Sequence, residues 1–133
     1  MDASGTGVGP MFYSVNLPKS SSAAVQARRA MDRLTGKVDR ETLSDARLLV
    51  SELVTNAVEH VDADGEIELR LELRDHVLRV EVLDPGPGFR PRPRRANDRK
   101  DSGWGLHFVS RIADRWAADV DGRARVWFEL GLA

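Results

Sequence analysis

Residues 66–84 read EIELRLELRDHVLRVEVLD, and this stretch decides the fold. Apolar residues occupy every second position from 67 to 73, which predicts a strand with one buried face. Asp75 and His76 interrupt the alternation and indicate a turn. The same period resumes over 77–83, and it places Asp84 on the side of the preceding apolar row. The sequence therefore predicts a β-hairpin that ends with an acid beside the core.

Strand-like and helix-like patterns follow each other on both sides of this hairpin. Strands are expected at 11–17, 116–120 and 123–130, the last two joined by an Asp-Gly turn at 121–122. Helices are expected at 23–34, where the serines at 20–22 offer caps and Gly36 follows the end, and at about 102–115. A long helix is expected from an Asp39 cap to about Val61. This order predicts an α+β two-layer sandwich, with a mixed, mostly antiparallel sheet and helices on one face.

Length and composition limit the possible functions. A chain of 133 residues is expected to form one domain, here residues 11–133. The formal charge of −1 gives no overall attraction to nucleic acid or to an anionic membrane. The absence of cysteine excludes disulfides, thiolate zinc sites and thiol nucleophiles, and it suits a reducing cytoplasm. Residues 1–10 are rich in glycine and small residues, without the pattern of a signal peptide, and are expected to form a flexible tail.

The first candidate motif lies in SELVTNAVEH, on the predicted long helix. Glu52, Asn56 and His60 recur every fourth residue, so they form a polar line that turns slowly into the apolar stripe beside Leu49 and Leu53. An amide oxygen is a suitable ligand for Mg²⁺, and a carboxylate can act as a base. The alternative is an amphipathic helix edge with a solvated glutamate and a hydrogen-bonded core histidine.

Two glycine-containing motifs follow the first. In Asp84-Pro85-Gly86-Pro87-Gly88, the glycines let the backbone turn or approach a ligand, and the carboxylate can accept a hydrogen bond from the amine of adenine. In Gly103-Trp104-Gly105-Leu106, the glycines begin a helix whose free N–H groups and dipole favour phosphate. The alternatives are an ordinary turn that closes a strand and a flexible start of a helix.

The three motifs in this order resemble the GHKL, or Bergerat-fold, ATP-binding superfamily of gyrase, heat-shock chaperone, mismatch-repair and histidine-kinase ATPases. Within it, LPKSSSAAVQARR, SELVTNAVEH and RVWFEL make the chain similar to the single-domain serine/threonine kinases that act as bacterial anti-sigma factors. The resemblance covers about residues 11–132.

The resemblance implies a role for each motif residue, with ATP and Mg²⁺ as the bound cofactors. Glu52 would be the general base and Asn56 the Mg²⁺ ligand, while Asp84 would bind the adenine amine. Gly86 and Gly88 would shape the adenine pocket. The residues expected against the phosphates at the helix start are Gly103, Gly105 and Leu106.

Two positions depart from the pattern of these kinases. Their threonine just before VWFEL, which contacts adenine through water, is replaced here by Arg125, so the adenine contact is expected to change. Trp104 stands between the glycines where relatives often carry a basic or small residue, and it is expected to stack on the pocket or shield it. Neither change removes the base or the metal ligand.

Residues 90–100, RPRPRRANDRK, match the position of the family's ATP lid, which is expected at about 89–102. Five arginines and one lysine stand against a single acid, Asp98. One or two of these cations are expected to contact phosphate, because arginine forms bidentate bonds with it. The remaining charges are expected to belong to a solvated loop.

The expected function is therefore that of an ATP-dependent serine/threonine kinase that phosphorylates an anti-sigma-factor antagonist of the STAS type and sequesters a sigma factor. The resemblance also implies a homodimer that pairs through its sheets. The alternative is an ATP-binding module that sequesters a protein partner without phosphorylating it. A histidine-kinase module lacks its phosphoacceptor helix here, and a nucleic-acid binder lacks aromatic residues in the arginine-rich loop.

Overall fold

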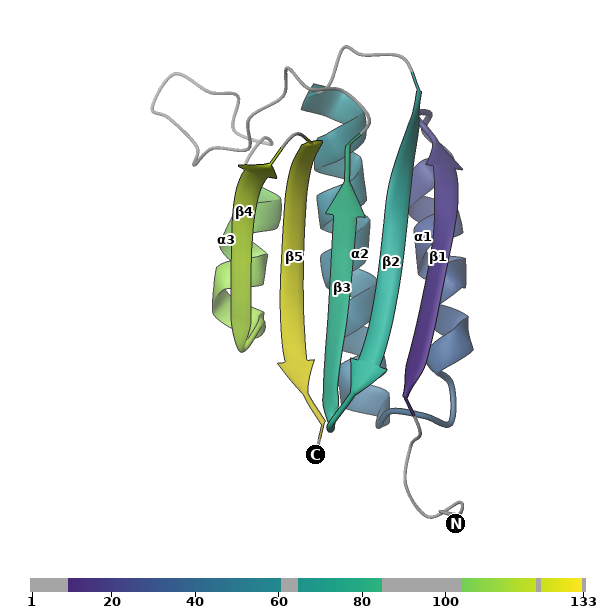
Figure 1. Cartoon of the computed structure of the whole chain (residues 1–133), viewed down its shortest axis with the longest axis vertical. Coiled ribbons are helices and arrows are strands. Elements are labelled where there is room, and N and C mark those ends of the chain that lie inside the picture. The colour runs from purple at the N-terminus through teal and green to yellow at the C-terminus, as the bar shows by residue number, and fades with distance from the viewer. Residues whose placement is uncertain (1–9, 61–64, 85–103, 122, 133) are drawn as a thin grey trace.

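A computed structural model describes residues 10–60, 65–84, 104–121 and 123–132. Its strands form one five-stranded sheet in the order β1-β2-β3-β5-β4 (Figure 1). All four pairings between them are antiparallel, so the described sheet is wholly antiparallel where a mixed one was expected. The strands are β1 Met11–Pro18, β2 Glu66–Arg74, β3 Val77–Leu83, β4 Arg115–Asp121 and β5 Arg123–Gly131.

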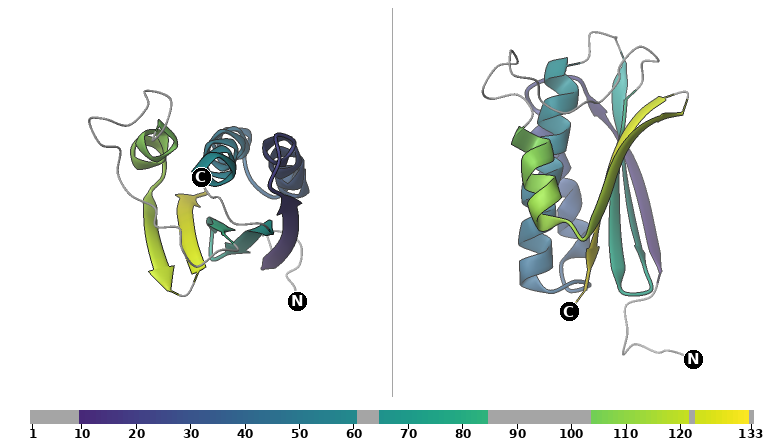
Figure 2. Two further views of the ribbon diagram at one scale, coloured as in Figure 1. Left: turned by 90° about the horizontal axis from the view of Figure 1, so that it is seen from above. Right: turned by 90° about the vertical axis from the view of Figure 1, so that its left-hand side faces the viewer.

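The helices form a second layer against one face of this sheet, in the spatial order α1, α2, α3 (Figure 2). They are α1 Ala23–Ala30, the 3-10 helix η1 Met31–Leu34, α2 Arg40–His60 and α3 Trp104–Ile112. The helix expected over 23–34 is thus divided into an α-helical and a 3-10 part. The last helix is shorter than expected, because Arg115 already begins β4. The predicted α+β two-layer sandwich is confirmed.

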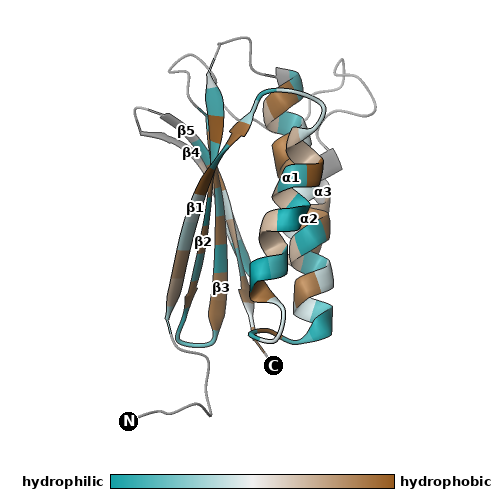
Figure 3. Ribbon diagram, turned by 90° about the vertical axis from the view of Figure 1, so that its right-hand side faces the viewer, coloured by the Kyte–Doolittle hydropathy of each residue, from teal (hydrophilic) through white to brown (hydrophobic). Residues whose placement is uncertain are grey.

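The core lies between the two layers and comes from alternate residues of the strands (Figure 3). In β2 the residues of the inner row, from Ile67 to Leu73, are at most 2% exposed. Phe128 of β5 is fully buried opposite Val80 of β3. The apolar stripe of α2 packs on the same face of the sheet, against β3 and β5, and burial of each large side chain stabilises the fold by roughly 1.5–3 kcal/mol. Its fully or nearly fully buried members are Ala46, Leu49, Val50, Leu53 and Val54.

The two expected helix caps differ in the structure. The carboxylate of Asp39 accepts hydrogen bonds from the backbone N–H of Thr42 at 3.1 Å and from its hydroxyl at 2.7 Å, as a capping residue does. Ser22 occupies the N-cap of α1 without a capping bond, and its hydroxyl accepts a hydrogen bond from Gln26 instead. Ser22 already has helical backbone angles, whereas a capping side chain normally needs an extended backbone.

The turn between β2 and β3 uses two residues in the left-handed region. Asp75 has φ 55° and His76 has φ 63°, which suits the twist of a two-residue hairpin but places a Cβ against the following carbonyl. The backbone carbonyl of His76 also accepts a hydrogen bond from the N–H of Leu132 at 2.8 Å. The residue after β5 is thereby attached to this hairpin.

In the described residues, no helix is both long and apolar enough to cross a bilayer.

Loss of the Asp39 cap should destabilise the long helix. We expect Asp39→Ala to lower the free energy of unfolding by about 1 kcal/mol, because two donors of Thr42 lose their partner. Asp39→Asn keeps an acceptor oxygen and should lose a smaller part of this. Urea denaturation of the three proteins measures the effect, and equal stability of the Ala variant and the wild type would show that the cap is not needed.

Strain in the hairpin should be relieved by glycine. We expect His76→Gly to raise the free energy of unfolding by roughly 0.5–1 kcal/mol, since relief of the left-handed strain exceeds the entropic cost of glycine. His76→Ala is the matched control, because alanine keeps the Cβ and should give no such gain. Thermal unfolding followed by circular dichroism compares the two, and an equal gain in both variants would assign the effect to the imidazole.

Candidate functional site

The two sides of α2 have different neighbours. On one flank Arg47 forms an ion pair with Asp32 of η1, and the hydroxyl of Ser51 accepts a hydrogen bond from Arg28 of α1 at 2.9 Å. One residue advances about 100° around a helix, so Glu52 lies across the outer surface from Ser51. Asn56 lies about 40° further on, nearer the sheet. Since α3 occupies that side of α2 (Figure 2), both residues line the α3 side of the helix.

Glu52 and Asn56 are both half-buried, at the border between the core and the surface. The expected polar line thus exists on one flank of α2, although neither residue is enclosed within the core. Half-exposed positions leave a carboxylate or an amide oxygen accessible to a ligand at this flank. His60 ends the helix, and its side chain lies outside the described residues.

Asp84 lies at the end of β3, on the face covered by the helices. It is 3% exposed, and it continues the inner row of Leu78, Val80 and Val82. The prediction that an acid ends this apolar row is confirmed. An acid in such a place can meet a ligand only at the end of the sheet, because the core fills the space below it.

Three parts of the candidate site lie toward one end of the molecule. β3 and α2 both run toward the upper end in Figure 1, and α3 begins there. The end of β3 carries Asp84, and the second half of α2 carries Glu52 and Asn56. Trp104, Gly105 and Leu106 form the first turn of α3, with side chains outside the described residues. Gly86, Gly88, Gly103 and the arginine-rich residues 90–100 also lie outside them.

Arg125 does not point toward this end of the helical face. Its neighbour Val126 belongs to the inner row of β5, so the alternation of the strand directs Arg125 to the opposite face of the sheet. There its guanidinium lies 3.6 Å from the carboxylate of Glu81. The sheet therefore separates the side chain of Arg125 from Asp84, and the expectation that its replacement of threonine changes the adenine contact stays a prediction.

Sequence reasoning missed the hydrogen bond from Arg28 to Ser51, which joins α1 to α2 one residue before Glu52. A serine on the polar side of an amphipathic helix carries no sign of its partner. The pairing depends on how α1 packs, and only the arrangement of the two helices shows it.

A family model described as a histidine kinase-like ATPase domain matches residues 17–129. The chain therefore belongs to this family, as the GHKL resemblance led us to expect, and membership of an ATPase family implies ATP binding. Comparison with curated proteins found no match.

Its fold is similar to that in the crystal structure of the RsbU and RsbW domains of Rv1364c from Mycobacterium tuberculosis. The TM-score is 0.71, and the match covers 92% of this chain and 32% of that one. The two sequences are 22% identical, so this likeness shows the fold.

The amide oxygen of Asn56 is a ligand of the kind that Mg²⁺ takes together with nucleotide phosphates. Within the described ranges, no three His, Cys, Asp or Glu side chains gather as a metal site. Mg²⁺ commonly takes one or two protein ligands and completes its shell with water and substrate phosphates. An amide oxygen at the half-buried position of Asn56 would suit that arrangement.

Asp84→Asn tests the expected contact with adenine. A hydrogen bond to a charged acceptor contributes roughly 1.5–3 kcal/mol, so we expect ATP affinity to fall by about tenfold to a hundredfold. Isothermal titration measures the affinity. Asp32→Asn, at an exposed acid on η1, is the control and should bind ATP like the wild type. Unchanged affinity in a folded Asp84→Asn protein would remove Asp84 from the site.

Proposed function

We propose that this chain is an ATP-binding, anti-sigma-factor-like protein kinase that transfers phosphate to a serine or threonine of a partner. The observation that supports this most directly is the placement of Glu52, Asn56 and Asp84. Two half-buried polar residues on the α3 flank of α2 and a buried acid at the end of β3 lie toward one end of the fold. A base, a metal ligand and an adenine acceptor are the three groups that the reaction requires.

In the proposed reaction, Asp84 orients the nucleotide by accepting a hydrogen bond from the adenine amine. Mg²⁺ bound with the nucleotide would offset negative charge on the phosphates in a loose transition state. Asn56 would bind this Mg²⁺ through its amide oxygen. Glu52 would accept the proton of the incoming hydroxyl. The hydroxyl oxygen would bond to the γ-phosphorus while the bond from the γ-phosphorus to the ADP oxygen breaks.

The proposed acceptor is an anti-sigma-factor antagonist of the STAS type. Phosphorylation would add about −1.5 to −2 charges to it and weaken its contact with this chain. The chain would then be free to hold a sigma factor, so that transcription would depend on the state of the antagonist. Family membership, the motifs and the similarity to a structure that contains an RsbW domain support this proposal.

Phosphate transfer from γ-labelled ATP to candidate antagonists tests the proposal directly. We expect Glu52→Ala to bind ATP nearly as the wild type does and to lose about 10²- to 10⁴-fold in transfer rate, because a general base is removed. Asn56→Ala should lose the part of ATP affinity that depends on Mg²⁺. Glu41→Ala, at an exposed glutamate in the first turn of the same helix, is the matched control and should retain both properties.

The outcomes separate three possibilities. ATP binding together with transfer that requires Glu52 supports the kinase. ATP binding without transfer to any antagonist would favour a regulatory module that sequesters its partner. Absence of nucleotide binding in the presence of Mg²⁺ would contradict the ATP site itself.

A further inference from the structure

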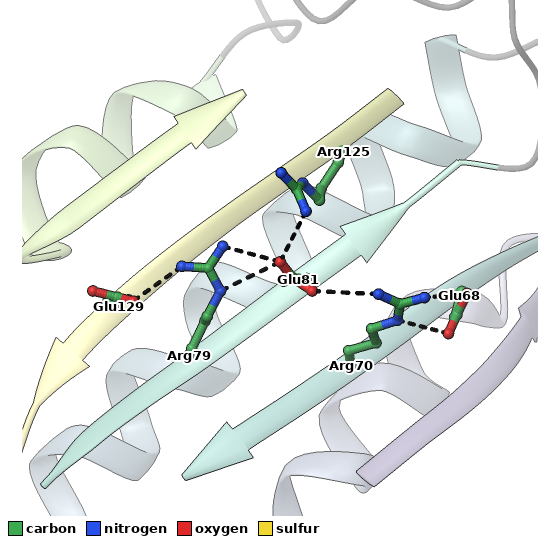
Figure 4. Close-up of polar contacts among 6 residues, drawn as sticks. All are labelled: Glu68, Arg70, Arg79, Glu81, Arg125 and Glu129. Atoms are coloured by element: carbon green, nitrogen blue, oxygen red, sulfur yellow. Dashed lines mark hydrogen bonds and ion pairs between the residues drawn. The ribbon is translucent and has the colours of Figure 1, made fainter. Parts of the chain in front are cut away.

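The face of the sheet opposite the helices carries a connected ion-pair network (Figure 4). Its centre is Glu81 of β3, whose side chain is only 12% exposed. Its carboxylate lies near three guanidinium groups, those of Arg79 at 3.0 Å, Arg125 at 3.6 Å and Arg70 at 3.8 Å. Arg79 also pairs with Glu129 of β5 at 3.0 Å. Since Arg70 belongs to β2 and Arg125 to β5, cations from both strands that flank β3 hold Glu81.

The network continues to the two outer strands of the sheet. The Nε of Arg70 donates a hydrogen bond to Glu68 at 2.8 Å, and this bond raises the pKa of the guanidinium. Glu68 accepts a second hydrogen bond, at 3.0 Å, from the hydroxyl of Ser14 on β1. At the other side, Glu129 lies 3.5 Å from Arg115 of β4. Side-chain contacts therefore connect all five strands on this face.

The network reaches the last row of β3. Leu83 ends this strand, and its partners across the sheet are Glu68 on one side and Arg125 on the other. Val82 and Asp84 face the helices, so Leu83 points to the network face, where it is only 5% exposed. Members of the network thus lie on both sides of the row that comes directly before Asp84.

The position of Asp84 depends on how firmly this row is held. Asp84 follows the last paired residue of β3, so a shift of the strand end against its neighbours would move the carboxylate relative to α2. Binding groups need to stay within roughly 0.5 Å of their productive position. Ion pairs between strands oppose such a shift, and partly buried pairs are screened by salt less than exposed pairs.

We propose that Arg125 is a positioning residue for nucleotide binding. Through its ion pair with Glu81 it holds the end of β3, and thereby Asp84, without contacting the nucleotide. This inference rests on the proposed function, because it requires that Asp84 binds the adenine amine. Arg125 is easier to test than Arg79, which also stacks on the ring of Trp127 at 3.9 Å.

Two nucleotides isolate the contact that Asp84 is expected to make. Purine riboside triphosphate differs from ATP only in lacking the exocyclic amino group. The ratio of its dissociation constant to that of ATP therefore measures the contact with the amine. A general loss of folding or of phosphate contacts would change both constants together and leave this ratio unchanged. The ratio separates a positioning role from a merely structural one.

Arg125→Met removes the charge and keeps an apolar stem. We expect the ratio to fall about threefold to tenfold, since a loosely held carboxylate forms a weaker hydrogen bond with the amine. Arg125→Lys keeps a cation and should retain most of the ratio. Arg74→Met is the matched control, because Arg74 is 64% exposed and pairs with Glu72 of its own strand. It should behave like the wild type when isothermal titration measures both constants.

A double variant tests whether Arg125 acts through Glu81. We expect Glu81→Gln to lower the ratio too, and Arg125→Met to cause no further fall in the Glu81→Gln protein, because residues that act through one contact are not additive. A further fall as large as in the wild-type background would show that Arg125 acts independently of Glu81 and would overturn the proposal. Urea denaturation of each variant ensures that the ratios compare folded proteins.

The outcomes distinguish failure of this inference from failure of the proposed function. Suppose that the wild type prefers ATP and that Asp84→Asn lowers this preference. An unchanged ratio in Arg125→Met would then overturn the positioning role alone. A wild type that binds neither nucleotide, or binds both equally, would contradict the adenine contact itself, and the positioning role would fail with it.

Discussion

The burial of one face of the β2–β3 hairpin against α2 is the constraint on which the rest of the structure depends. Because side chains alternate along a strand, covering Leu69 and Leu71 fixes which face of the sheet meets the helices. The same alternation places Asp84 on the covered face and Glu81 on the open one. A slip of one residue in β3 would exchange these two acids and remove Asp84 from the site.

Most of the fold could be predicted from the sequence because its strands and long helix show regular periods. β2 and β3 have the predicted bounds, and Asp39 caps α2 as expected. The change from α-helix to 3-10 helix at Met31 was not predicted, because both forms bury residues at similar spacings. Ser22 failed as a cap for a local reason, since its backbone is already helical.

The site could be predicted in part, for the same physical reason. The two-residue period of a strand fixes which face each side chain occupies. The buried position of Asp84 could therefore be predicted from the alternation along β3. The expectation for Arg125 came from the resemblance alone; strand alternation places its side chain on the face opposite Asp84, and its effect on adenine binding stays a prediction. Among the motif glycines, Gly105 is the one that the described residues include, within α3. The expected roles of these glycines therefore stay predictions. The hydrogen bond from Arg28 to Ser51 could not be predicted, because it depends on how α1 and α2 pack in space.

The two faces of the sheet separate the two kinds of chemistry that this chain carries. The candidate site residues Glu52, Asn56 and Asp84 lie on the helical side of the sheet. There the hydrophobic core fixes the positions of α2 and β3. Charged residues on the other face neutralise one another, so they keep that face solvated and leave β1 as the uncharged boundary. α1 links the β1 side of the molecule to the candidate site, because it packs against both β1 and α2 and because Arg28 donates a hydrogen bond to Ser51, the residue before Glu52.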